Sequence, residues 1–388
     1  MKLLFIVSVP SQEGSNLSLL NLITALRNEG HECGLLASRD GFLIDKLSSL
    51  GVKCGVIRYR AALYPLSRTV KDILYYIPSL LLLLENIINY KQVRHFVEDF
   101  SPDIIHTNVS TINVGYKVAK ELKIPHVWHI REYMDLDFNI HPFPTMESRK
   151  KQLADSYTIS ITKDIRRHFG LERNDKANVI YNGIMKSSEV HFDGNKQPVF
   201  LYAAFLQQCK GVYDLLNAFA NHIIQRPNSP YKLRLLGGYT PDVYEKVIRF
   251  IKENGIDNKV EVMGKVSPET VCRNLRTASV TFIPSFSEGF GRTTAEAMFN
   301  GCLVAGRNTG GTKEQFDNGI SATGCEIGLR FDTVGDMTSI MNEISDRGTS
   351  GYNKMIMSSQ KVVADLYSIE TNVEQTLKLY KKILDERS

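Results

Sequence analysis

Short apolar stretches alternate with amphipathic stretches along the chain, which predicts a regular succession of strands and helices. The first apolar strand is expected over residues 2–9, followed by a polar loop over 10–16 and a helix over 17–29, where apolar residues recur at helical spacing. Further strands are predicted over residues 33–38, 103–107, 126–130, 157–162 and 177–181, with a helix over 111–122. Strands joined through single helices pair in parallel with right-handed crossovers, so we predict a doubly wound α/β sheet.

The same pattern starts again after Asn182-Gly183 and a polar segment over residues 186–197. Strands are predicted over residues 198–203, 231–236, 259–263, 280–284 and 302–306, and helices over 212–222, 241–254 and 369–384. A chain of 388 residues is too long for one ordinary core and fits two domains of about 190 residues each. We therefore predict two Rossmann-like domains, over residues 1–183 and 184–388.

A glycine-containing loop between the strand at 280–284 and a helix at 294–300 is the strongest candidate for chemistry. Its backbone amides and the positive end of the helix dipole suit a phosphate, and Gly301 is placed for a left-handed helix end. Glu288 lies in the loop and Glu296 in the expected first helical turn, so both carboxylates can accept hydrogen bonds from sugar hydroxyls. A phosphate site beside two such carboxylates indicates a nucleotide sugar.

A structural alternative exists for the second glutamate. Thr293 and Glu296 have the spacing of a capping box, which would stabilise the helix without any ligand. This alternative leaves Glu288, in its glycine-flanked loop, unexplained.

Glu288-Gly-Phe-Gly, followed after four residues by Glu296-Ala-Met and then by Gly310-Gly311, resembles the Glu-x7-Glu motif of retaining glycosyltransferases of family 4. That family has the GT-B fold, in which two Rossmann-like domains face each other across a cleft. The opening loop, Asn182-Gly183 and Lys210-Gly211 also match, so the resemblance covers nearly the whole chain and is to the type that assembles bacterial cell-envelope polysaccharides.

The resemblance implies an acceptor-binding domain over residues 1–183, a nucleotide-sugar-binding domain over 184–388, and a terminal helix at 366–388 that packs back on the first domain. It assigns catalytic roles to three residues: Glu288, Lys210, which would bind the leaving diphosphate, and His129, at the end of a strand. The donor-binding residues would be Gly289, Phe290, Gly291, Arg292, Thr293, Thr294, Glu296 and Gly311. The acceptor or phosphate loop would be Gly14, Ser15 and Asn16, for which an ordinary helix cap by Ser15 or Asn16 is an equal alternative.

One departure from the family concerns the cations around the diphosphate. An arginine often precedes the lysine in the family, but residues 203–209 contain none. Arg292 and Arg307 are the candidate substitutes, and the backbone amides of Thr293, Thr294 and Gly311 are the alternative.

No metal and no dinucleotide cofactor is expected. Asp135-Leu136-Asp137 has the Asp-x-Asp spacing of a manganese site, but no further acidic cluster accompanies it, so we assign it to a loop. The first strand is not followed by Gly-x-Gly-x-x-Gly, which disfavours nicotinamide and flavin dinucleotides. The six cysteines lack Cys-x-x-Cys spacing, which argues against a zinc site or a disulfide framework and suits a reducing cytoplasm.

A basic segment over residues 46–94 holds eight lysines and arginines against two acidic residues. Within it, the leucine-rich run at 73–84 is too short to span a bilayer, and it fits either a buried helix or a surface that contacts a membrane. Because no signal peptide precedes the first strand, we expect a cytoplasmic protein, with peripheral contact to an anionic membrane as the functional interpretation of this segment.

The prediction from the sequence is a metal-independent, retaining hexosyltransferase of GT-B fold. It would use a nucleoside diphosphate sugar, with UDP as the expected nucleotide, and a glycan or polyprenol-linked glycan as acceptor, by front-face substitution. No nucleic-acid-binding motif accompanies the net charge of +5, so no nucleic acid partner is expected. A UDP-sugar 2-epimerase on the same fold and a non-catalytic sugar-nucleotide-binding partner are the alternatives.

Overall fold

The computed structural model describes residues 1–12, 14–65, 81 and 83–387, and these fall into two compact units. Unit 1 contains Met1–Gly183 together with Ile369–Ser388, and unit 2 contains Ile184–Ser368. Arg68, Lys71 and most of the leucine-rich run at 73–84 lie outside the described residues. No helix in the described part of the chain is long and apolar enough to cross a membrane.

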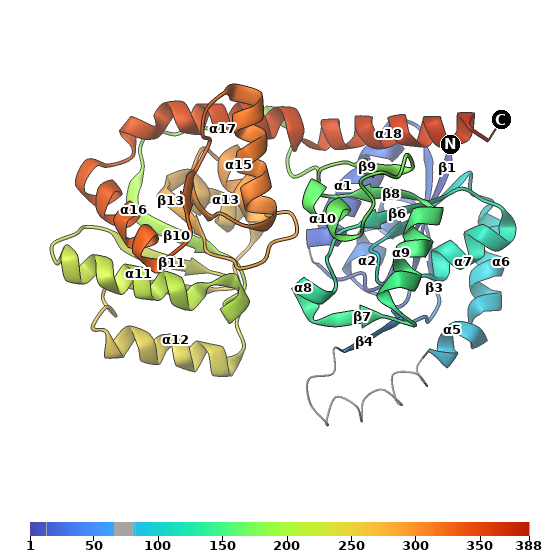
Figure 1. Cartoon of the computed structure of the whole chain (residues 1–388), viewed down its shortest axis with the longest axis horizontal. Coiled ribbons are helices and arrows are strands. Elements are labelled where there is room, and N and C mark those ends of the chain that lie inside the picture. The colour runs from blue at the N-terminus through green and yellow to red at the C-terminus, as the bar shows by residue number, and fades with distance from the viewer. Residues whose placement is uncertain (13, 66–80, 82, 388) are drawn as a thin grey trace. The chain divides into compact units, whose positions relative to one another are not determined.

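Unit 1 is built on a parallel sheet (Figure 1), which has seven strands among the described residues in the order β3-β2-β1-β5-β6-β8-β9. These strands are β1 (Lys2–Val7), β2 (Glu32–Ala37), β3 (Lys53–Val56), β5 (Ile104–Asn108), β6 (His126–Ile130), β8 (Tyr157–Ser160) and β9 (Ala177–Val179). Among the described residues, the helices of the unit are α1 (Gly14–Asn28), α2 (Phe42–Ser49), α5 (Leu84–Ile88), α6 (Tyr90–Phe100), α7 (Val114–Leu122), α8 (Asp135–Phe138), α9 (Met146–Asp155), α10 (Lys163–His168) and α18 (Ile369–Asp385). A short antiparallel pair, β4 (Leu63–Pro65) with β7 (Ile140–Pro142), lies apart from the sheet.

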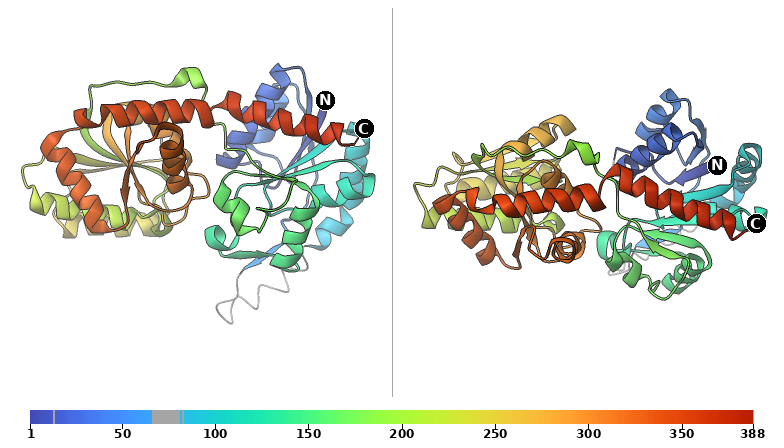
Figure 2. Two further views of the ribbon diagram at one scale, coloured as in Figure 1. Left: turned by 45° about the horizontal axis from the view of Figure 1, so that its top comes forward. Right: turned by 90° about the horizontal axis from the view of Figure 1, so that it is seen from above.

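The alternation of side chains along β1 explains why helices cover both faces of this sheet. Leu3, Phe5 and Val7 belong to a core with α1 and α2, whereas Leu4 and Ile6 belong to a second core with α6 and α7. The terminal helix α18 joins the first of these cores through one apolar stripe, and Figure 2 shows it along the α1 side of the sheet.

Unit 2 repeats the architecture on a parallel sheet that has, within the described residues, the strand order β12-β11-β10-β13-β14-β15. Its strands are β10 (Gln197–Ala203), β11 (Lys232–Leu236), β12 (Val260–Gly264), β13 (Ala278–Ile283), β14 (Leu303–Arg307) and β15 (Leu329–Phe331). Its α-helices are α11 (Val212–Gln225), α12 (Pro241–Glu253), α13 (Pro268–Thr277), α14 (Arg292–Phe299), α15 (Gly310–Thr323), α16 (Val334–Arg347) and α17 (Asn353–Leu366). Its short 3₁₀ helices are Ser187–Glu189, Gln208–Lys210 and Ser350–Tyr352. The predicted α/β fold with two Rossmann-like domains is confirmed.

Two predicted loops are wrong in detail. The helix α1 begins at Gly14 and not at residue 17, so Gly14, Ser15 and Asn16 form its first turn and neither Ser15 nor Asn16 is its cap. Asp135 and Asp137 lie in the four-residue helix α8, which ends because Asn139 adopts a left-handed conformation.

Candidate functional site

The loop after β13 leads directly into α14, and the helix begins earlier than its sequence pattern indicates. Gly291 is the N-cap with a φ of 84°, a conformation that glycine adopts at little cost, so Arg292 is already helical. Glu296 therefore lies in the second turn and the predicted capping box with Thr293 is not formed. Since Gly291 has no side chain to cap the helix, the first-turn amides and the helix dipole are left to bind an anion. The predicted helix end is confirmed, because Gly301 has a φ of 64°.

Glu288 and Lys210, which are far apart in the sequence, form an ion pair. Lys210 ends the short 3₁₀ helix after β10, and its Nζ lies 2.8 Å from Oε2 of Glu288. Both side chains are about three-quarters buried, with exposed fractions of 26% and 22%. The structure thus brings together two of the residues that the sequence predicts to be catalytic.

The N-terminus of α15 holds the loop around Glu288 in place. The amide of Gly311 donates to the carbonyl of Glu288 at 2.7 Å, and a Cβ at this glycine would lie 2.3 Å from the Phe290 carbonyl group. Gln315 donates through Nε2 to the carbonyls of Phe290 and Gly291. The amide of Gly311 is therefore used within the protein, and the expectation that it supplements the diphosphate clamp is wrong.

Other residues of the motif are divided between ligand-facing and structural positions. Phe290 is buried, with its ring edge-on to Tyr367 at 5.5 Å between centroids, so its side chain belongs to the core of unit 2. Thr293 donates to the carbonyl of Ala203, and the hydroxyl of Thr294 bonds that of Thr312. What these two threonines can offer a ligand is their backbone N–H groups.

Of the two arginines proposed to replace the missing clamp arginine, Arg307 is committed to structural contacts. Its guanidinium donates to the carbonyls of Pro284 and Asp332, forms a 2.6 Å ion pair with Asp214, and lies 4.2 Å over the Phe286 ring. It therefore fixes the start of the loop instead of facing a ligand. Arg292 is one turn from Glu296 on α14, with Nη2 at 3.1 Å from Oε1, and stays the candidate cation.

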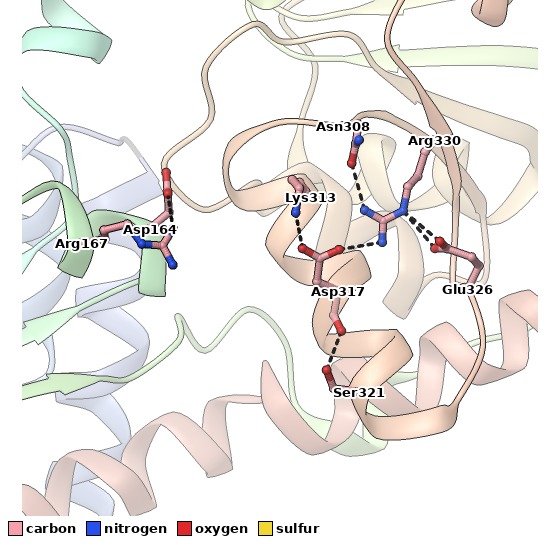
Figure 3. A network of polar contacts seen from close by, with 8 residues as sticks. All are labelled: Asp164, Arg167, Asn308, Lys313, Asp317, Ser321, Glu326 and Arg330. Carbon is pink, nitrogen blue, oxygen red and sulfur yellow. Dashed lines mark hydrogen bonds and ion pairs between the residues drawn. The ribbon is translucent and has the colours of Figure 1, made fainter. Parts of the chain in front are cut away.

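A charged network that the sequence pattern did not reveal orients α15 (Figure 3). Arg330 on β15 donates to Glu326 and to Asn308, which precedes α15, and it forms a 2.9 Å ion pair with Asp317. Lys313, one turn earlier on α15, also pairs with Asp317. The network ties β15, the turn after β14 and the body of α15 together, which keeps Gly311 against the Glu288 loop.

In unit 1, His129 at the end of β6 is fully buried within a polar chain. Its Nδ1 lies 3.1 Å from Nε2 of His106 on β5, and Nδ1 of His106 lies 2.6 Å from the hydroxyl of Tyr380 on α18. Arg131 approaches the same Nδ1 of His129 at 3.3 Å and also donates to Asn182. The sequence missed His106 and Tyr380; a histidine within an otherwise apolar strand was the available signal.

The hydrogen-bond donors among these buried side chains fix the tautomers of both histidines. Burial, followed by the charge of Arg131, lowers the pKa of His129 and of His106 well below the ordinary value, so both rings are neutral. Because a guanidinium only donates, Nδ1 of His129 accepts, and Nε2 of His106 must donate to it. The proton of His129 is then on Nε2, which has no hydrogen-bond partner among the described residues. His129 therefore presents a donor, and it does not act as a base in this state.

Two further predicted sites have internal contacts. Asn16 is buried, and its Nδ2 donates to the carbonyls of Val9 and Ser11, so this side chain fastens the loop after β1 to α1. Asp135 lies 2.9 Å from Nε2 of His168 on α10. Asp135 therefore contacts a neighbouring helix, and the assignment of this segment to a loop is corrected to the short helix α8.

Two protein-family models match the chain, one after the other. The model described as Glycosyltransferase Family 4 matches residues 13–186, and the model described as Glycosyl transferases group 1 matches residues 185–343. The change from one match to the other falls close to the boundary between the two units.

Similar proteins were found both by sequence and by structure. An uncharacterized glycosyltransferase of Methanocaldococcus jannaschii is 25% identical over 305 residues, which are 76% of this chain and 80% of that protein. A D-inositol 3-phosphate glycosyltransferase of Corynebacterium kroppenstedtii is 29% identical over 126 residues, 32% of this chain and 28% of that protein. The crystal structure of HepE of Anabaena in complex with UDP aligns with a TM-score of 0.76 and 17% identity over 98% of this chain and 100% of that one. The likeness to HepE shows a shared fold.

Proposed function

We propose that this chain is a retaining hexosyltransferase that uses a UDP-linked sugar, on the basis of its GT-B fold and its matches to the two glycosyltransferase family models. The acceptor would be a glycan or a lipid-linked glycan of the cell envelope. The observation that carries the proposal is the Lys210–Glu288 pair beside the uncapped N-terminus of α14. HepE has been solved with UDP and with UDP-glucose, which supports UDP as the nucleotide here.

A bound donor would break this ion pair and give each of its two residues a new partner. The diphosphate would attract Lys210 and the first-turn amides of α14, and this would release Glu288 to accept hydrogen bonds from hydroxyls of the donor sugar. Glu296, further along α14, would accept from the ribose hydroxyls. Arg292 would supply the second cation, in the place where the family often has an arginine before the lysine.

The reaction we propose is a front-face substitution without a metal ion. The bond between the anomeric carbon and the diphosphate oxygen breaks, the acceptor oxygen bonds to that carbon on the same face, and the acceptor proton passes to the departing oxygen. Lys210 and the α14 amides would stabilise the negative charge that develops on the diphosphate. His129 is fully buried, so its Nε2–H would reach a substrate oxygen only after the side chains that cover it move.

The proposal is tested by transfer assays with a panel of UDP-sugars and glycan acceptors, with and without excess EDTA. Lys210→Ala should lower the rate roughly 10²–10³-fold, because it removes a donor aimed at the leaving group. Lys232→Ala is a matched control, since Lys232 also pairs with a glutamate, Glu261 at 3.1 Å, on the surface of the same unit. NMR of the product should show the anomeric configuration of the donor.

Each other outcome contradicts a defined part of the proposal. Inversion of the anomeric centre refutes the front-face mechanism, and loss of activity in EDTA that manganese restores refutes metal independence. Interconversion of the UDP-sugar without an acceptor would indicate the 2-epimerase, and donor binding without turnover on any acceptor would indicate the non-catalytic partner.

We also propose a peripheral contact between unit 1 and an anionic membrane. Among the described residues, α5 exposes Leu84, Ile87 and Ile88, with exposed fractions of 48%, 72% and 72%. Apolar side chains exposed beside arginines are typical of a surface that lies at a lipid interface.

A further inference from the structure

Unit 1 contains a cavity of about 350 Å³ that is lined by three arginines. Arg39 follows β2, whereas Arg58 and Arg60 follow β3, and the end of β1 forms another wall through Ser8 and Val9. The cavity thus lies at the carboxyl ends of three parallel strands, where open α/β sheets bind their ligands.

The segment after β3 is held in place by hydrogen bonds, and it carries two of these arginines, Arg58 and Arg60. Tyr59 is buried, and its hydroxyl proton is shared between the carbonyls of Val7 and Leu36, which anchors this segment to the ends of β1 and β2. Arg58 and Arg60, on either side of this anchor, are both exposed and both line the cavity. Asn89 donates to the carbonyl of Arg58, and Asn86 bonds both the amide and the carbonyl of Arg60. The backbone is therefore fixed while the guanidinium groups line the cavity.

The cavity has three arginines beside one carboxylate. Arg60 pairs with Glu85 at 2.8 Å, and the hydrogen bond from Arg60, followed by the charges of Arg60 and Arg58, lowers the pKa of this carboxyl. Neither Arg39 nor Arg58 forms an ion pair of its own with any residue that the structure describes. Guanidinium groups bind phosphate through paired, charge-assisted hydrogen bonds, and they do so best in a concave site. The charge pattern fits a phosphate group.

A second, larger cavity of about 480 Å³ borders the first. Its lining is mostly apolar and includes Ile87, Val114 and Phe143, and Leu83 lines both cavities. Asn86 also lines the apolar cavity while it holds the backbone of Arg60. A phosphate site that adjoins an apolar site of this size suits one ligand with both properties.

We propose that the two cavities together bind a lipid phosphate, with the phosphate between the arginines and the hydrocarbon chain along the apolar cavity. The inference rests on the proposed function only where it identifies this lipid as the carrier of the acceptor glycan. A lipid headgroup of the membrane supplies the same chemistry, and the experiment separates the two sources.

The test compares the binding of methyl phosphate and of octyl phosphate, below its micellar concentration, by calorimetry. Octyl phosphate should bind at least tenfold more tightly, because each buried CH₂ contributes about 0.8 kcal/mol. The double variant Arg39→Ala/Arg58→Ala should lose at least about tenfold in affinity for both compounds. Ile87→Ser, at a well-exposed position, should reduce the advantage of the octyl chain and leave the affinity for methyl phosphate unchanged.

The control variant Arg167→Ala/Arg173→Ala removes the same charge from exposed positions of the same unit and should change neither affinity. UDP binding separates this site from the proposed donor site. Lys210→Ala should weaken UDP and spare octyl phosphate, and the Arg39/Arg58 variant should do the reverse. If Lys210→Ala does not weaken UDP binding, the result counts against the proposed function. If the Arg39/Arg58 variant does not weaken octyl phosphate binding, the result counts against the lipid phosphate site.

Octyl phosphate that competes with the acceptor in transfer assays identifies the acceptor's own lipid as the ligand. Binding to phosphatidylglycerol vesicles that the Arg39/Arg58 variant loses, without such competition, identifies a membrane headgroup. Equal losses in the control variant, or equal affinities of methyl and octyl phosphate, overturn the proposal.

Discussion

At the scale of single residues, the two glutamates of the motif differ in position and in partner. Glu288 lies in the loop and pairs with Lys210, whereas Glu296 lies in the second turn of α14 and pairs with Arg292. We predict that Glu288→Gln lowers turnover far more than donor affinity, and that Glu296→Ala mainly weakens nucleotide binding. Kinetics at saturating donor and calorimetry with UDP separate the two effects; equal losses of affinity with unchanged turnover would refute the division.

The hydrogen bonds that link Tyr380 to His106 and His106 to His129 lead to a second prediction at the scale of residues. Tyr380→Phe removes the hydroxyl that donates to His106, so the His106 tautomer is no longer fixed and the Nε2–H of His129 is less well defined. ¹⁵N NMR of the histidine rings should show protonated Nε2 on both histidines of the unchanged protein and a mixture of tautomers for His106 in the variant. Protonated Nδ1 on His129 in the unchanged protein would contradict the assignment.

At the scale of elements, the close approach of α15 to the Glu288 loop is what positions the carboxylate. Gly311→Ala would place a Cβ 2.3 Å from the Phe290 carbonyl, so the loop must shift and the Lys210–Glu288 pair must move with it. We expect transfer activity to fall at least tenfold, since a displacement of about 1 Å can cost 10²-fold. Gly335→Ala in α16 is the control, because its Cβ would have its nearest contact at 3.6 Å, and it should leave activity unchanged.

The strands β5 and β6 carry three buried histidines whose protonation opposes folding. Burial lowers the pKa of His126 to about 3 and, with the charge of Arg131, lowers that of His106 and His129 well below the ordinary value. Below a pH of about 6.5 the unfolded chain takes up protons that the folded chain does not, so stability falls as the pH falls. The loss approaches about 1.4 kcal/mol per pH unit for each histidine.

Urea unfolding between pH 7.5 and 5.5 tests this prediction in a range where carboxylates stay ionised. The free energy of unfolding should decrease toward pH 5.5, and His126→Gln should make the slope shallower, because one of the buried histidines is removed while His222, whose pKa burial also lowers, keeps part of the slope. Stability that is independent of pH over this range would contradict the histidine assignment.

Elements with a clear period were predictable from the sequence, and those set by tertiary contacts were not. The strand at residues 126–130 was predicted with the bounds that β6 has, because five buried residues follow one another there. The start of α14 was missed because it depends on the φ of Gly291. The helix α15 was missed because its glycines and polar residues have low helix propensity, and packing and the Arg330 network stabilise it instead. Of the site, Glu288 and Lys210 could be found from the sequence, but their ion pair could not.

At the scale of the whole molecule, the repeated strand–helix pattern was enough to predict two Rossmann-like units. The pattern does not indicate which unit each C-terminal helix belongs to. The helix α17 belongs to unit 2, whereas α18, which begins at Ile369, belongs to unit 1. The apolar stripe of α18 and the hydrogen bond from Asn372 to the Tyr181 carbonyl explain that assignment. Helical periodicity alone does not specify which core a helix joins.

The last prediction concerns the membrane. Exposed basic residues near an anionic membrane contribute about 1 kcal/mol each. Arg58, Arg60, Lys91 and Arg94 are exposed in unit 1, so they should give a reversible, salt-sensitive attachment. Sedimentation with phosphatidylglycerol liposomes should fall steeply between low and moderate salt. It should fall further in Leu84→Ser/Ile88→Ser, whose side chains are exposed on α5 and line neither cavity of unit 1 described above.

A matched control for this variant is Ile224→Ser, an apolar residue of unit 2 with an exposed fraction of 74% that should not contribute to membrane binding. Neutral phosphatidylcholine liposomes should bind neither protein appreciably. If the unchanged protein ignores anionic liposomes even at low salt, the apolar side chains of α5 have no membrane role, and a soluble acceptor becomes the better hypothesis. If the Ile224 variant loses binding as much as the α5 variant does, attachment does not depend on the α5 surface.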